Sequence, residues 1–277
     1  MGLDGLSHAS GPQHFRDGHL ATSVIAAWYL CHENGLDEPT QDLIKSLIDR
    51  ELREDAIFLP VPDEPADSAL LEHLLATLSA GIGDLREVGH NIIFGAAALK
   101  VFRHCPETIT PSRVDGICKL IDNFATPQSV TLEDEDGIPD IADESTLIRF
   151  IFSEYLRSVV LYTGYGQGWA GHLLTIGHAV IELSRLGYQD LAARAHKAYR
   201  MYITTLRRGP RETDRHIPEH PPSNLTPLDR YYWKQRKTVR SGLGHAFKYP
   251  WSFFSLLSRL DDQNLKQRCL AAGYAIF

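Results

Sequence analysis

The sequence predicts an all-α fold, and two observations support this prediction. Apolar residues recur at three- and four-residue spacing along nearly the whole chain, while the alternation typical of strands is almost absent. The dipeptide Gly-His opens four similar segments, which begin near residues 18, 89, 171 and 244 and follow one another at intervals of 71 to 82 residues. A period of this length indicates one structural unit used four times. We therefore expect residues 1–277 to form a single all-α repeat domain.

Each unit is predicted to be a helical hairpin. Its first helix starts near the Gly-His pair and is apolar nearly all round, as in the run IIFGAAALKVF, which has one charge in eleven residues. Such a helix is buried on most sides. The second helix is amphipathic, as in DEPTQDLIKSLIDREL, and should expose one face to water. Gly35, Pro106 and Gly187 mark the breaks between the two helices, and Thr110 and Pro111 are typical of a helix start.

Additional helical stretches precede the second, third and fourth units, which gives about eleven helices in total. They cover 67–80, 144–162 and 226–240. Inner apolar helices surrounded by amphipathic ones are typical of an α/α toroid or a closed solenoid-like bundle. In such a ring all four inner helices begin at the same end. We therefore expect one histidine from each unit to lie around one mouth of a central cavity.

Composition argues against several classes of function. The net charge of -7 and the pI near 6.0 argue against a nucleic-acid-binding protein. No apolar stretch approaches 18 residues and no signal peptide is recognisable, so we expect no membrane span. The four cysteines lack CxxC spacing, which indicates reduced thiols in a cytoplasmic protein. P-loop, GxSxG and strand-linked GxGxxG motifs are missing.

The repeat places His19, His90, His172 and His245 at the same phase of the four units. Several neutral imidazoles without cysteine favour iron, copper, nickel or zinc. Nitrogen separations of roughly 3–4 Å would fit one metal ion bound at about 2.0–2.1 Å per ligand. The alternative is that each histidine only holds the start of its helix, where the preceding glycine lets the backbone turn without a Cβ penalty.

Helix polarity sets a condition on such a metal site. Four helix N-termini bring partial positive charge to one point, so a metal ion there would need an anionic partner. Lys248 follows His245 by three residues and shares its helix face. As a carbamylated lysine it would supply a carboxylate-like ligand, whereas the alternative is a lysine that reaches the surface. His178 follows His172 by six residues, lies on a different face, and is the candidate catalytic group.

Three segments resemble the questin oxidase-like family: GWAGHLLTIGHAVIEL, DGHLATSVIAAWYL and GHAFKYPWSFF. That family carries similar helices that begin with histidine, although this chain is shorter and has Leu173 where the family often has proline. The resemblance implies an all-helical oxygenase that acts with dioxygen on aromatic polyketide-like small molecules at a non-heme iron. It also implies that the ligands are His19, His90, His172, His245 and Lys248.

The leading hypothesis is therefore an iron-dependent oxygenase whose partners are a small aromatic substrate and dioxygen. Two alternatives stay open. One is a metal-free enzyme in which a histidine acts as general base within an anion-binding cavity. The other is a helical-repeat scaffold that binds a ligand or a protein, with the histidines serving only to cap helices.

Overall fold

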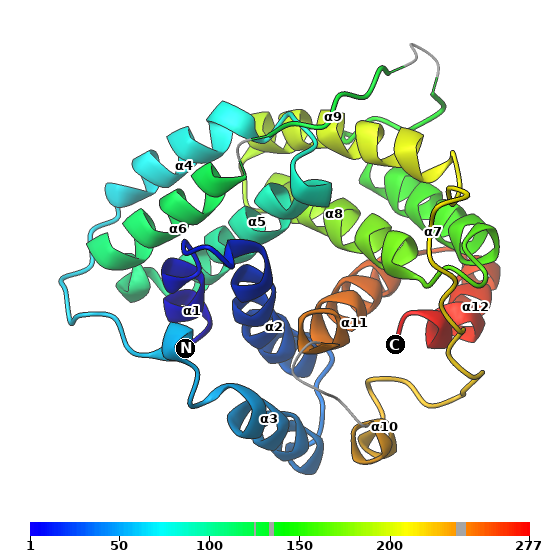
Figure 1. The fold of residues 1–277 in the computed structure, drawn as a ribbon, viewed down its shortest axis with the longest axis horizontal. Coiled ribbons are helices and arrows are strands. Elements are labelled where there is room, and N and C mark those ends of the chain that lie inside the picture. Colours follow the sequence, from blue (N-terminus) through cyan, green and yellow to red (C-terminus); the bar gives the residue numbers. More distant parts are fainter. Residues whose placement is uncertain (125, 133–135, 237–241) are drawn as a thin grey trace.

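The computed structural model describes residues 1–277 except 125, 133–135 and 237–241. The described part is all-helical and compact, with twelve α-helices, several short 3-10 turns and no strand (Figure 1). The all-α prediction is therefore confirmed. The fourfold repeat and the closed toroid remain interpretations of the sequence pattern. None of the helices in the described ranges combines the length and the apolar character that crossing a bilayer requires.

Four helices lie toward the middle of the molecule and eight lie around them (Figure 1). The inner helices are α2 (His14–Glu33), α5 (His90–His104), α8 (Gly168–Arg185) and α11 (Leu243–Ser258). The outer helices are α1 (Gly2–His8), α3 (Glu38–Leu52), α4 (Leu70–Gly81), α6 (Pro111–Asn123), α7 (Glu144–Leu161), α9 (Gln189–Leu206), α10 (Arg230–Gln235) and α12 (Gln263–Ala272). Each inner helix begins with or contains one of the four histidines predicted to form the site.

The outer helices start at residues that suit helix N-termini. Asp37, Asp143 and Asp262 each accept a hydrogen bond from a backbone N–H three residues later, which satisfies a free donor of the first turn. Proline stands in the first turn of α3 and of α6, where it costs no hydrogen bond. These local signals explain why the predicted amphipathic helices form where the sequence places them.

Two boundaries differ from the prediction. The segment before the first unit contains α1, whose Leu3 and Leu6 are buried against α2 and α6. The predicted stretch 226–240 is helical only over the six residues of α10, and its last residues lie outside the described part. These two helices have seven and six residues, which is less than two full turns. Apolar periodicity cannot define helices this short, so tertiary packing determines where they form.

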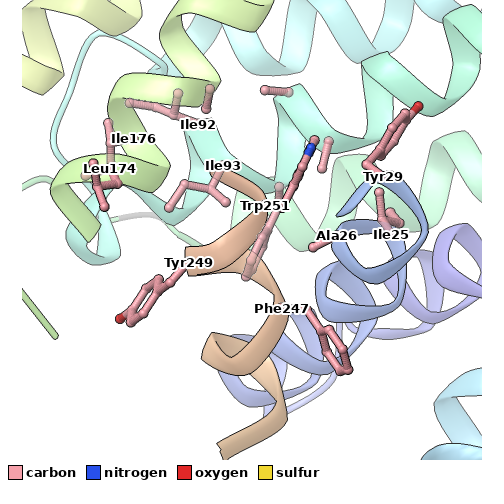
Figure 2. Packing of buried hydrophobic residues seen from close by; sticks show 14 of the residues in the cluster. Ile25, Ala26, Tyr29, Ile92, Ile93, Leu174, Ile176, Phe247, Tyr249 and Trp251 are labelled. Atoms are coloured by element: carbon pink, nitrogen blue, oxygen red, sulfur yellow. The ribbon is translucent and has the colours of Figure 1, made fainter. Parts of the chain in front are cut away.

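The inner helices share one continuous apolar core. Figure 2 shows Trp251 of α11 projecting toward Tyr29 of α2, and their rings stack at 5.2 Å with an interplanar angle of 12°. Ile93 of α5 and Ile176 of α8 are buried in the same cluster. A buried aromatic side chain removes a large apolar area from water, worth roughly 1.5–3 kcal/mol each. This packing holds the inner helices against one another.

Glycines before the histidines allow these helices to approach one another closely. A Cβ on Gly18 would meet Phe94, one on Gly89 would meet Ile176, one on Gly171 would meet Tyr249, and one on Gly244 would meet His19. In these contacts α2 packs on α5, α5 on α8, α8 on α11, and α11 on α2. The four inner helices therefore contact one another in a closed cycle.

The helix-start position predicted for these glycines is confirmed for Gly89 and Gly244. Gly89 has φ of +80° and immediately precedes α5, a conformation that glycine adopts without steric cost. Gly244 is the second residue of α11, so it lies in the first turn of that helix. The prediction of a glycine helix start is wrong at Gly18 and Gly171, because α2 and α8 begin earlier, at His14 and Gly168.

Candidate metal centre

Three of the predicted ligands come together from three helices. His19 of α2, His172 of α8 and His245 of α11 each offer one ring nitrogen, and these nitrogens lie within 4.8 Å of one another. His90 of α5 adjoins them: its Nε2 is 3.3 Å from Nε2 of His172, and its ring centroid is 4.4 Å from that of His19. All four inner helices thus contribute an imidazole to one cluster, which we call the histidine cluster.

Hydrogen bonds to the backbone fix the tautomers of two of these rings. Nδ1 of His172 lies 2.7 Å from the carbonyl oxygen of Gly168, and Nδ1 of His90 makes a short contact with that of Glu87. A carbonyl oxygen only accepts, so both Nδ1 atoms donate, and in the neutral rings both Nε2 atoms carry lone pairs. These lone pairs face each other at 3.3 Å and cannot form a hydrogen bond.

The same separation suits two ligands of one metal ion. Two nitrogens bound at about 2.0–2.1 Å in tetrahedral geometry lie roughly 3.3–3.4 Å apart. Donation from the other ring nitrogen to a carbonyl is also the usual way in which a metal-binding imidazole is oriented. The pair formed by His90 and His172 therefore has both the spacing and the tautomers that a shared cation requires.

An unusual backbone conformation brings Glu87 onto His90. Glu87, Val88 and Gly89 have successive φ values of 43°, 58° and 80°. A left-handed conformation costs a non-glycine residue about 1–2 kcal/mol, and more for a β-branched side chain such as that of Val88. Conformations of this kind persist where the surrounding structure holds them and are concentrated at functional sites. Here the turn sets the tautomer of His90.

Lys248 contacts the cluster through His19. Its Nζ lies 2.7 Å from Nδ1 of His19 and 5.4 Å from the centroid of the Phe94 ring, and the residue is 1% exposed. Burial, with no acidic group to offset it, lowers the pKa of Lys248 well below its ordinary value. This contact occupies Nδ1 of His19, and its buried Nε2, which has no hydrogen-bond partner, is the atom free to bind a metal. The alternative of a lysine reaching the surface is wrong, while its carbamylation stays a prediction.

Two aromatic residues that the sequence pattern did not predict lie beside the cluster. Tyr249 stacks on His245 at 4.6 Å and 13°, and its hydroxyl lies 3.1 Å from Nδ1 of His172. Phe15 contacts the rings of both His19 and His90 edge to face, at centroid distances of 4.7 and 4.6 Å. Each of these two residues is four positions from a histidine on its own helix. That i, i+4 spacing, which places both on the histidine face, is the signal that could have found them.

Burial keeps the imidazoles neutral. It lowers the pKa of His172 to about 3 and that of His245 to about 2, with a further decrease from the nearby Lys248. The pKa values of His19 and His90 fall well below the ordinary value for the same two reasons. The neutral ring is the form that binds a metal. At neutral pH all four rings therefore present lone pairs rather than positive charge.

His178 lies in a different polar network. Its Nδ1 is 3.1 Å from Oγ of Ser252, its Nε2 is 3.8 Å from a carboxylate oxygen of Glu182, and Glu182 also pairs with Lys100 and Arg259. A cavity of about 10 Å³, with room for about one water molecule, is lined by both His178 and Lys248. The structure places His178 outside the three-histidine group, and its catalytic role stays a prediction.

Comparison with known proteins finds no relative that would identify this site. No protein-family model matches the chain, and no curated protein or solved structure matches it either. The resemblance to the questin oxidase-like family therefore rests on the sequence motifs alone. What the fold and the site geometry establish is a cluster of buried and half-buried histidines, three of which could hold a metal ion.

Proposed function

We propose that this protein is a metal-dependent oxygenase that binds iron through His19, His172 and His245, with His90 as a fourth ligand, and acts on a small aromatic molecule. The observation that carries the metal part is the convergence of three ring nitrogens within 4.8 Å of one another. The oxygenase part draws its support from the resemblance to the questin oxidase-like family.

The donor set fits a transition-metal ion in two further respects. The Nε2 atoms of His19 and His245 are buried and have no hydrogen-bond partner. Leaving a polar atom buried and unpaired costs about 1–3 kcal/mol, and metal binding would offset that cost. Neutral imidazoles suit iron, copper, nickel and zinc alike. Among the described residues no cysteine belongs to the group that could hold a metal, which disfavours metals that prefer sulfur.

Bound iron would supply Lewis acidity and a redox-active centre for chemistry with dioxygen. The residues of the chain hold and orient that centre. The carbonyls of Glu87 and Gly168 direct His90 and His172, and Lys248 directs His19. Phe94, which is fully buried, packs against the rings of His19 and His90 and excludes water from that side.

Metal analysis of the purified protein tests this proposal. We expect about one equivalent of transition metal, or uptake of one equivalent of iron when it is added anaerobically. The variants His90→Ala and His245→Ala should both lose bound metal, and His73→Ala, which removes an exposed histidine of α4, should retain it. Less than a few tenths of an equivalent, with no uptake on iron addition, would contradict metal binding. Retention of metal in both cluster variants would show that the ligand set is wrong.

Dioxygen consumption tests the oxygenase part separately. Iron-loaded protein given a panel of polycyclic phenols should consume dioxygen, whereas apoprotein and His245→Ala should not. If a fully loaded protein consumes no dioxygen with any member of the panel, the proposed metal site stands and the proposed oxygenase activity is contradicted. It would then favour the scaffold hypothesis or a redox-neutral metal enzyme.

A further inference from the structure

We infer that a cavity beside α10 is a second binding site, separate from the histidine cluster, and that it takes a small phosphate, either free or as a monoester. The cavity has a volume of about 200 Å³ and lies where α10, the irregular segment 220–225 and the C-terminal residues meet. None of the four cluster histidines lines it. The inference therefore does not rest on the proposed metal binding. Two features of the cavity support it: an unpaired guanidinium and a set of hydrogen-bond donors.

Arg236 supplies the positive charge of this cavity. It directly follows α10 and is half-buried, its guanidinium contacts the hydroxyl and the ring of Tyr232, and no carboxylate among the described residues pairs with it. Burial lowers its pKa to about 10, so the group stays charged at neutral pH. By contrast, Arg113, Arg207 and Arg259 each pair with a buried carboxylate. A bound anion would offset the desolvation cost of Arg236 in the same way.

Other polar groups at the cavity can donate hydrogen bonds. Oγ of Ser223 accepts from the backbone N–H of Leu225, and the hydroxyl of Tyr232 accepts from Arg236. A hydroxyl that accepts still has its own hydrogen to donate, so both groups can donate to a ligand. The amide of Gln235 lines the same cavity, and no acidic side chain is among the described residues that do. Several donors around a positive charge, without a negative side chain, favour an anion.

The number and origin of the donors favour a phosphate over a carboxylate. A carboxylate offers two oxygens, which the fork of one guanidinium satisfies, whereas a phosphoryl group offers three strong acceptor oxygens. Arg236 and Tyr232 lie at and just before the end of α10, while Ser223 comes from the irregular segment, so two separate segments supply the donors. The cavity is smaller than the roughly 300–1,000 Å³ typical of sites for drug-sized molecules. It therefore suits a small phosphate.

Binding of small anions to the metal-free protein tests the inference. Titration calorimetry compares inorganic phosphate, methyl phosphate and acetate at equal ionic strength, on full-length protein from which a chelating resin has removed metal ions. We expect saturable binding of one phosphate per chain, about 10-fold or more tighter than that of acetate, because a phosphate accepts more charge-assisted hydrogen bonds. The tighter of the two phosphates shows whether the site takes free phosphate or a monoester.

Three variants test the residues of the cavity. Arg236→Gln removes the positive charge and should weaken phosphate binding about 10-fold or more. Tyr232→Phe keeps the ring, removes one donor hydroxyl and should weaken binding about 2- to 10-fold. Lys234→Gln removes an exposed charge of the same helix, and as the matched control it should leave the affinity unchanged. Urea unfolding of each variant shows that it is folded.

Equal phosphate affinity in Arg236→Gln and the unsubstituted protein would overturn the inference, as would the absence of saturable phosphate binding. Acetate bound as tightly as phosphate would contradict the assignment of the ligand as a phosphate. The proposed metal site is tested separately, because His245→Ala should lose bound metal and yet bind phosphate with unchanged affinity. Loss of phosphate binding in His245→Ala would place the anion at the histidine cluster and overturn the second site.

Discussion

Lys248 and Lys100 show how neighbouring groups decide what a buried lysine contributes. Both residues lie on inner helices, and both are at most 6% exposed. Lys100 pairs with the carboxylates of Glu33 and Glu182, whereas Lys248 contacts Nδ1 of His19 and an aromatic ring. A carboxylate beside a buried amine stabilises the charged form of the amine. For a buried amine without a carboxylate, nothing offsets the free-energy cost of desolvation. Lys248 is therefore retained at the expense of stability, in keeping with a role in orienting His19.

Replacement of each lysine by methionine tests this difference. Lys248→Met removes a buried amine that has no carboxylate beside it, so we expect the free energy of unfolding of the metal-free protein to rise. The same change leaves Nδ1 of His19 without its partner and should weaken metal binding about 10- to 100-fold. Lys100→Met leaves Glu33 without this cation and Glu182 with Arg259 as its remaining partner, and it should destabilise the protein by about 3–5 kcal/mol. Urea unfolding measures the changes in stability, and metal titration measures the change in metal affinity. If Lys248→Met destabilises the protein, the desolvation cost assigned to Lys248 is contradicted.

Sequence reasoning reached the four histidines but missed part of their surroundings. Their equal phase in the repeat predicted convergence, which the structure shows for His19, His172 and His245 with His90 alongside. Phe15 and Tyr249 were missed because a lone aromatic residue on an apolar helix face is indistinguishable from a core residue until the partner helices are in place. The strained turn before His90 could not be predicted either, because glutamate and valine are not residue types that favour positive φ.

At the scale of helices, close packing rather than capping explains Gly18 and Gly171. Periodicity predicted the inner and outer helices, but it could not predict that α2 and α8 begin upstream of their glycines. A glycine at a helix start and a glycine at a helix crossing look the same in a single sequence. The distinction depends on which side chain of another helix occupies the space of the missing Cβ, as Tyr249 does at Gly171.

Two alanine substitutions within α8 test the packing role. A Cβ at Gly171 would meet the ring of Tyr249, while a Cβ at Gly168 meets nothing within 4 Å. We expect Gly171→Ala to destabilise the protein by about 1–3 kcal/mol through overpacking. Gly168→Ala should be neutral or stabilising by up to about 1 kcal/mol, because alanine is the better helix former. Thermal or urea unfolding compares the two variants, and equal effects would exclude a specific contact between α8 and α11.

Across the whole molecule, the interior combines apolar packing with an uncommon number of neutral histidines. The sequence predicted a buried core of four helices, and that core is present. It did not predict the network of Lys100, Glu182 and Arg259, because the two ion pairs join residues 82 and 77 positions apart that share no local pattern. Together these buried titratable groups decide how the fold responds to pH.

Acid should destabilise the metal-free protein at pH values above those at which its carboxylates titrate. The pKa values of His172 and His178 are lowered to about 3 and that of His245 to about 2, mainly by burial. In the unfolded chain these rings bind protons near pH 6.5, so their contribution is fully present above about pH 6.5 and is lost as the pH falls toward 3. Each ring lowers the stability by up to about 1.4 kcal/mol per pH unit in that window.

Glu182 acts in a separate and lower window. Its pKa is lowered to about 2 by the positive charges around it, although burial opposes the shift. Its stabilisation is therefore present above about pH 4.5 and is lost only between there and pH 2. A decrease in unfolding free energy between pH 6.5 and 4.5 thus belongs to the histidines. Urea unfolding at pH 8, 7, 6, 5 and 4 measures this decrease.

A variant of one buried ring isolates its share of this pH dependence. In His178→Asn the unfolding free energy should fall less steeply below pH 6.5, by about 1.4 kcal/mol per pH unit, than in the unsubstituted protein. His73→Ala, which removes a ring that is 57% exposed, should leave the slope unchanged. Saturation with metal should oppose the acid effect, since ligation and protonation compete for the same nitrogens. A stability that stays constant from pH 8 to 4.5 would contradict the buried, neutral state of these rings.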